Sequence, residues 1–96
     1  MTIDPPAFRR VPHAPWRSVG DDVYVAPLGR AELDRLAGPA ATAWRVLETP
    51  ASMAELLGAL GEAYSMPTDA ILPEVEEMVR ELLARGLIEG ADGGSD

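Results

Sequence analysis

The sequence predicts an α+β fold in which short antiparallel strands are followed by three helices. Between residues 16 and 26, β-branched and aromatic residues alternate around a central glycine, a pattern typical of a hairpin. From residue 39 onward, apolar residues recur at helical spacing, and proline, serine and glycine residues mark the ends of three helices. The chain length of 96 residues suits one small domain.

The hairpin is the first predicted element. Residues 16–19 and 22–26 flank Gly20 and Asp21, and a glycine at the first central position favours a type II′ or type I′ turn, because that position needs a positive φ. Pro27 then stops the second strand or confines it to a sheet edge, because proline has no backbone N–H to donate.

Residues 31–37 form an ambiguous segment. Leu33 and Leu36 lie three residues apart and fit one face of a helix, and the alanine and glutamate residues around them are good helix formers. Local propensity alone therefore favours a helical turn here.

Two helices follow this segment. Proline at the first helical position predicts a short helix over residues 39–47 that buries Trp44. A capping box formed by Ser52 and Glu55 opens a second helix, whose apolar residues continue at helical spacing to Tyr64. Both aromatic residues are predicted to lie in the core.

The third helix is predicted to start near Thr68 or Asp69 and to run to Arg85, with Gly86 as its C-terminal cap. Its apolar residues fill an arc of about 140°, wider than one packing contact needs. Either one edge of this arc forms half of a binding groove, or both edges pack in the core. The residues of the arc are Ile71, Leu72, Val75, Met78, Val79, Leu82 and Leu83.

The two ends of the chain are predicted to be unpacked. Four prolines in residues 1–15 each remove a backbone donor, so this stretch is expected to be a flexible arm. Residues 90–96 contain three glycines and no large apolar residue, which indicates a disordered tail. The folded domain is therefore expected to span residues 16–89. The N-terminal stretch has no apolar run typical of a signal peptide or membrane anchor, so we expect a cytoplasmic protein without a membrane partner.

Charge separates the two halves of the chain. Residues 48–96 contain eleven acidic residues and two arginines, a balance of −9, whereas residues 1–47 contain five acidic residues and six arginines, a balance of +1. Lys and Arg contacts with phosphate supply most of the affinity for DNA. Because the third helix has the opposite sign, nucleic acid is not the expected partner.

Catalysis has few candidate groups in this sequence. Cysteine and lysine are absent, and His13 is the single histidine, in the predicted arm. The carboxylate pairs Asp21 with Asp22 and Glu76 with Glu77 are adjacent in sequence, so they are expected to be solvated surface charges. No metal-binding spacing or phosphate-binding loop is present. We therefore expect no enzyme activity, no metal and no cofactor.

The order of these elements, and the turn and cap residues between them, resemble those of the PqqD-like family of peptide-binding domains called RiPP recognition elements. The residues that carry the resemblance are the hairpin 16–26, the segment 36–44, the start of the second helix at 49–56, and residues 75–88. Where the family commonly has Gly-x-x-Tyr or a β-branched run in its third strand, this chain has Arg-Ala-Glu-Leu-Asp-Arg-Leu-Ala at 30–37.

The resemblance implies a small winged helix-turn-helix with an N-terminal three-stranded antiparallel sheet followed by three helices. It implies that the domain binds the leader segment of a ribosomally synthesised precursor peptide by strand addition, and presents it to a maturation enzyme such as a protease, cyclase or radical enzyme. Residues 31–37 would then be a short edge strand that becomes ordered when the peptide adds. Flanking carboxylates would favour a leader with a nearby Arg or Lys. The implied contacts are Ala31, Glu32, Leu33, Asp34, Arg35, Leu36, Glu74, Val75, Met78, Glu81 and Leu82.

Two other functions fit the same sequence pattern. A winged-helix regulator would act through protein contacts or DNA. A titration with duplex DNA at low salt would distinguish a DNA-binding regulator from a peptide-binding domain. A structural subunit could use the open apolar edge of the third helix to dimerise, which would give a mass in solution that depends on concentration.

Overall fold

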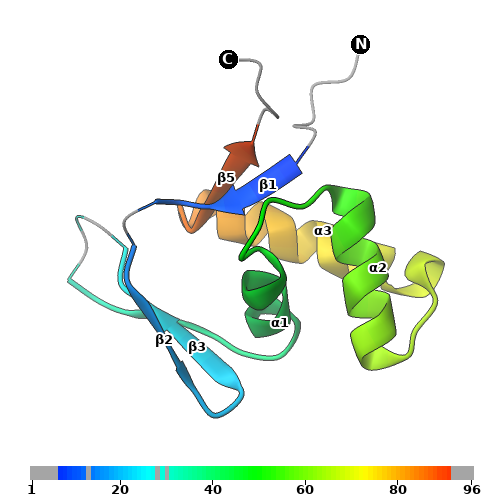
Figure 1. Ribbon diagram of the computed structural model, residues 1–96, viewed down its shortest axis with the longest axis horizontal. Helices are drawn as coiled ribbons and strands as arrows, with labels where there is room; N and C mark the ends of the chain where they lie inside the picture. Colours follow the sequence, from blue (N-terminus) through cyan, green and yellow to red (C-terminus); the bar gives the residue numbers. More distant parts are fainter. Residues whose placement is uncertain (1–6, 13, 28, 30, 92–96) are drawn as a thin grey trace.

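The computed structural model describes residues 7–12, 14–27, 29 and 31–91 of the chain (Figure 1). The α+β class with three helices and antiparallel sheets is confirmed. Helix α1 lies centrally and contacts both strand β3 and helix α2. In chain order the elements are β1 (Ala7–Arg10), β2 (Trp16–Val19), β3 (Asp22–Val25), β4 (Asp34–Leu36), α1 (Pro39–Val46), α2 (Met53–Tyr64), α3 (Thr68–Ala84) and β5 (Ile88–Ala91).

The strands form two sheets and not one. β2, β3 and β4 make an antiparallel sheet in that order, and β1 pairs with β5 in a separate two-stranded antiparallel sheet. The three-stranded sheet was predicted, but the second sheet was not. Its two strands lie at opposite ends of the sequence, so no local pattern of turns connects them.

The prediction of an unpacked arm is wrong for β1. Phe8 is only 5% exposed and belongs to the core. Arg10 donates from Nε and Nη2 to the carbonyl oxygen of Trp44, at 2.9 and 2.6 Å. Prolines around a segment limit its local conformations, but they do not prevent it from pairing with a distant strand. Residues 1–6 and His13, also predicted to be mobile or idle, lie outside the described residues.

The predicted tail begins within a strand. Gly90 and Ala91 complete β5, where they pair with Phe8 and Ala7. The described part of the fold therefore extends beyond the predicted limits of residues 16 and 89 in both directions. The remainder of the predicted tail, residues 92–96, lies outside the described residues.

The hairpin forms as predicted, with a two-residue connection between Val19 and Asp22. Gly20 has a φ of 62° and Asp21 does not have a positive φ, which fits type II′ and not type I′. Beyond the hairpin, the helical turn favoured by propensity is absent, because Asp34–Leu36 pairs with β3 as β4. Leu36 lies opposite Val23 and is buried, so packing against the sheet outweighs the weak local preference.

The helices follow their predicted ends closely. Ser52 and Glu55 form the capping box, with Ser52 Oγ accepting from the Glu55 backbone N–H and Glu55 accepting from that of Ser52. Gly86 (φ 74°) ends α3, where the Leu87 N–H donates to the Leu82 carbonyl oxygen, as in a Schellman motif. Within the described residues, no helix is long and apolar enough to cross a membrane.

The core lies between the sheets and the helices. Trp44 is completely buried, as predicted. Tyr64 is 40% exposed, so its assignment to the core is wrong, and its hydroxyl lies 3.1 Å from Thr42 Oγ1. Tyr64 is the last residue of α2, where the helix has already passed the edge of the core. The largest fully buried side chains are Trp44, Leu47, Leu56, Leu60, Leu87, Val23, Val25 and Val75.

Candidate functional site

β4 is a free edge of the three-stranded sheet. One side pairs with β3, with Asp34 opposite Val25 and Leu36 opposite Val23. Within the described part of the chain, no strand pairs with its other side. The backbone groups along that side can therefore accept a further strand.

A groove runs between β4, the start of α1, and α3. One hollow, of about 210 Å³, is lined by residues of all three segments. A second hollow, of about 390 Å³, continues along α3 and shares Met78 and Glu81 with the first. We call these two hollows together the α3 groove. The first is lined by Arg35, Leu36, Ala37, Ala40, Met78, Glu81, Leu82 and Arg85, and the second by Pro73, Glu74, Glu77, Met78 and Glu81.

Arg85 joins β4 to α3 at one end of this groove. Its Nη2 lies 2.9 Å from Glu81 Oε2, one helical turn earlier, and its Nη1 lies 3.7 Å from Asp34 Oδ1 in β4. The guanidinium therefore offsets both carboxylates. It is also a side-chain link between the strand and the helix at this end of the groove.

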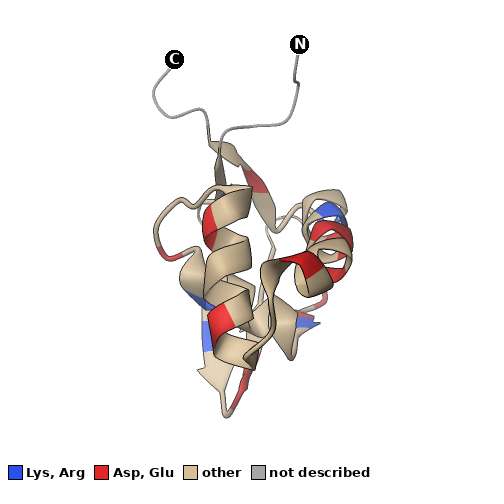
Figure 2. Cartoon of the chain, turned by 90° about the vertical axis from the view of Figure 1, so that its right-hand side faces the viewer, with Lys and Arg blue, Asp and Glu red and all other residues tan. Residues whose placement is uncertain are grey.

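The other end of the groove is negatively charged. Glu74 and Glu77 are exposed on α3, and among the described residues neither has an ion-pair partner. Figure 2 shows acidic residues along the helices. With Met78 between these carboxylates and Glu81, the groove combines an adaptable apolar surface with negative charge.

The structure brings together most, but not all, of the predicted contact residues. Val75 is only 1% exposed and belongs to the core, so its predicted place in the lining of the groove is wrong. Ala31 and Glu32 are exposed before β4 begins and line neither hollow of the groove. Leu33 lies on the opposite face of the sheet. Those that line the groove are Arg35, Leu36, Glu74, Met78, Glu81 and Leu82, with Asp34 tied to it through Arg85.

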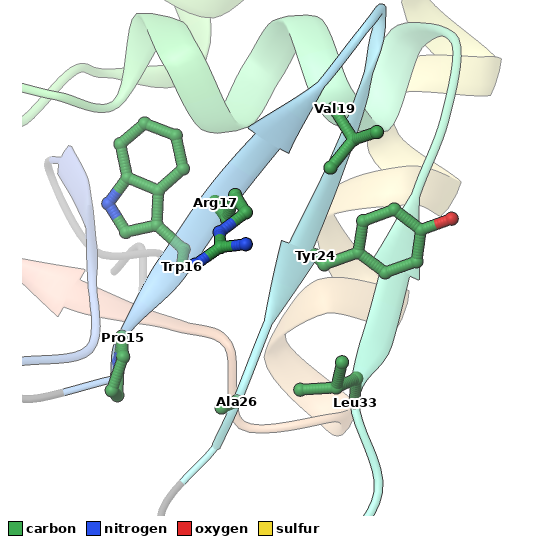
Figure 3. Close-up of a pocket in the computed structure, with 7 residues that line it drawn as sticks. All are labelled: Pro15, Trp16, Arg17, Val19, Tyr24, Ala26 and Leu33. Carbon is green, nitrogen blue, oxygen red and sulfur yellow. The ribbon is translucent and has the colours of Figure 1, made fainter.

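Sequence reasoning missed a third hollow, on the outer face of the β2-β3-β4 sheet (Figure 3). It has a volume of about 420 Å³, and we call it the outer hollow. Alternation along the hairpin could have indicated it, because Val23 and Val25 face the core and the residue between them must face outward. Its lining residues are Pro15, Trp16, Arg17, Val19, Tyr24, Ala26 and Leu33.

Trp16 borders the outer hollow at β2, and because it is opposite Val25 its ring lies on the core side of the sheet, beyond the strand (Figure 3). Its ring packs edge to face on Trp44, with ring centroids 6.1 Å apart and an interplanar angle of 75°. The Arg10 guanidinium lies 4.7 Å from the Trp16 centroid and 4.8 Å from that of Trp44. Burial lowers the pKa of Arg10, and the nearby Glu48 partly opposes this effect. These contacts hold the Trp16 ring against the core and anchor β2 at the border of the outer hollow.

The remaining chemistry of the described residues is limited. They contain no group of three or more His, Cys, Asp or Glu side chains that could hold a metal ion. The Asp22 carboxylate, one of the paired acids singled out in the sequence, accepts a hydrogen bond from Arg35 Nε at 2.9 Å. This ion pair raises the pKa of Arg35 and links β3 to β4.

Comparison with known proteins identifies the family. The family described as Coenzyme PQQ synthesis protein D (PqqD) matches residues 30–88, which is more than half of the chain. The match includes β4, the three helices and therefore both sides of the α3 groove. Comparisons with curated proteins and with solved structures gave no match. The chain belongs to the PqqD family.

Proposed function

We propose that this protein binds the leader segment of a ribosomally synthesised precursor peptide as an added strand on β4, and presents it to a separate maturation enzyme. Membership of the PqqD family supports a non-catalytic, peptide-binding role in this kind of biosynthesis. The observation that carries the proposal is that no strand of the described residues pairs with the second side of β4, which lies beside the α3 groove. We infer a winged helix-turn-helix scaffold and a cytoplasmic location with it.

Strand addition divides recognition between backbone and side chains. Backbone hydrogen bonds along β4 would supply affinity for many sequences, and alternate side chains of the peptide would enter the α3 groove and supply specificity. Met78 is half-buried and shared by both hollows, so it is the central apolar contact of the groove. A basic residue of the peptide would be favoured near Glu74 and Glu77.

A display library of random peptides tests this function without knowledge of the natural precursor. Binders selected on the full chain are resynthesised with single N-methyl groups at successive positions. N-methylation removes a backbone donor, so binding should be lost at alternate positions of the peptide and kept at the positions between them. Loss at every position or at none would contradict strand addition.

Amide hydrogen exchange locates the added strand. The amides of β4 should exchange fast in the free protein and slowly in the complex, because a three-residue edge strand is protected on one side only. Those of α2 should change little. Slow exchange of β4 without peptide, or protection that appears only elsewhere, would contradict the proposed site.

A further inference from the structure

We propose that the outer hollow is a second recognition surface for the same peptide, and that it takes a large apolar side chain projecting from the outer side of the added strand. This inference rests on the proposed function, because the peptide must lie beside β4. It assigns a role to the face of the sheet opposite the α3 groove. The peptide would then be recognised on both faces of the strand it forms.

Exposed apolar surface is concentrated at the outer hollow. Trp16, Val19 and Leu33 are among the most exposed large apolar side chains of the described chain, and all three line it. Leu33, at 62% exposed, is the most exposed of all. The inner face of the same sheet is sealed by completely buried valines of β3. The outer face is therefore a rigid platform with uncovered apolar side chains.

The geometry of the sheet directs this hollow toward the free edge. Tyr24 lies opposite Arg35 of β4, and Figure 3 shows its ring on the side of β3 that faces β4, with Leu33 at the start of that strand. A strand added to β4 would lie about 4.8 Å away. Diagonal neighbours across such a pair are about 7 to 8 Å apart, within reach of aromatic and long side chains. An outward side chain of the added strand would thus contact Leu33, and the Tyr24 ring, which extends from β3 toward β4, borders the same hollow.

Charge favours the peptide over a second copy of the chain. In a two-fold dimer the same patch would meet itself. On this face Arg35 is paired with Asp22, whereas Arg17 has no carboxylate partner among the described residues. Self-association through this face would therefore bring the unpaired Arg17 side chains of the two copies toward each other, which is unfavourable. A peptide with an acidic residue two positions from its outward apolar residue, and therefore on the same face, would place that carboxylate beside Arg35 of β4.

The proposal predicts a pattern within the peptide itself. Because successive side chains of a strand point to opposite faces, inward and outward positions alternate. Inward positions should favour apolar and basic residues for the α3 groove. Outward positions should favour one large apolar or aromatic residue and an acidic residue two positions away.

The experiment compares two leucines. The random-peptide selection is repeated on the wild-type protein, on Leu33→Ser and on Leu83→Ser. Leu83 is also exposed, at 38%, but lies on α3 and lines neither the groove nor the outer hollow. Leu33→Ser should weaken the best wild-type binders roughly 10-fold, as truncation of an apolar contact costing somewhat above 1 kcal/mol would. It should also remove the outward apolar preference. Leu83→Ser should do neither.

The outcomes separate this inference from the proposed function. Strand-adding binders with inward preferences but no outward preference would overturn the inference and leave the function intact. A selection that gives no strand-adding binder would contradict both the inference and the proposed function. A concentration-dependent dimer that Leu33→Ser abolishes would assign the outer hollow to a second copy and overturn the inference as well.

Discussion

β1 and β4 are both short strands, yet one is closed into the fold and the other is open. β1 pairs with β5 along its length, and on its other side Phe8 exchanges backbone hydrogen bonds with Ala51, at 2.8 and 3.0 Å. β4 pairs with β3 on one side, and no other strand in the described part of the chain pairs with its second side. β1 contributes the buried Phe8 side chain to the core. β4 instead lies beside the α3 groove, which its residues help to line.

This difference separates stability from recognition within one small domain. A strand with partners on both sides has no free backbone groups to offer a ligand, and its loss would expose the core. A strand with one partner is weakly protected but can bind. Changes in β1 should therefore affect folding, and changes beside β4 should affect binding. The following predictions test this division.

The largest effect is expected for Phe8→Ala. Truncation of a buried aromatic side chain costs about 3 to 5 kcal/mol of the free energy of unfolding, and a domain of this size has about 5 to 15 kcal/mol in total. Denaturant unfolding would measure it, with Arg9→Ala as the neighbouring exposed control. A loss no larger than that of the control would mean that β1 is dispensable, as expected for an unpacked arm.

Met78→Ala should affect binding more than folding. Truncation of a central apolar contact costs on the order of 2 kcal/mol, which weakens peptide binding roughly 30-fold. Trp44→Ala is the contrasting variant, because loss of a fully buried Trp costs about 3 to 5 kcal/mol of stability. Thermal melting and titration with a selected peptide would be compared. If Met78→Ala lowered the melting temperature as severely as Trp44→Ala and left the affinity of the folded fraction intact, Met78 would be a core residue only.

Arg10→Lys should cost about 1 to 2 kcal/mol of stability, since a charge-assisted hydrogen bond contributes about 1.5 to 3 kcal/mol and lysine retains only part of it. Lysine keeps the charge but loses the planar group that bonds the Trp44 carbonyl and lies on two tryptophan rings. Arg17→Lys on the exposed face is the matched control and should be neutral. Equal melting temperatures for the two variants would show that only the charge of Arg10 matters.

The smallest effect is expected for Arg35→Ala. This side chain is exposed and its ion pair with Asp22 is open to solvent, and such pairs contribute little to stability. The melting temperature should therefore remain close to that of the wild type. If the strand β4 instead lost its pairing with β3, seen as faster exchange at Val23 and Val25, the ion pair would be holding the edge in place.

The features that were predicted correctly depend on local chemistry. The capping box at Ser52, the glycine cap at Gly86 and the glycine turn at Gly20 each act within a few residues, so their sequence patterns were sufficient. The pairing of β1 with β5 joins residues about 80 positions apart, as in the Arg9 to Glu89 ion pair. No local pattern indicates such a contact, and the prolines near β1 suggested the opposite.

The candidate site was predicted in part for the same reason. Helical spacing placed Met78 and Glu81 at one edge of α3, and the structure shows both in the groove. Spacing alone could not tell that Val75, next to this edge, turns fully into the core. The strand at Asp34–Leu36 was obscured by helix formers, because its conformation depends on β3 and not on its own residues.

The pairing of β1 with β5 also makes the domain modular. Ala7 and Ala91 are opposite each other in an antiparallel pair, so the chain enters and leaves the described fold at neighbouring points. Figure 1 places this pair at the other end of the molecule from the β2–β3 hairpin. Paired residues in such a ladder have Cα atoms roughly 4.5 to 5.5 Å apart. A surface loop of another protein could therefore carry the whole domain as an insertion with little change in its own conformation, and β4 would remain accessible.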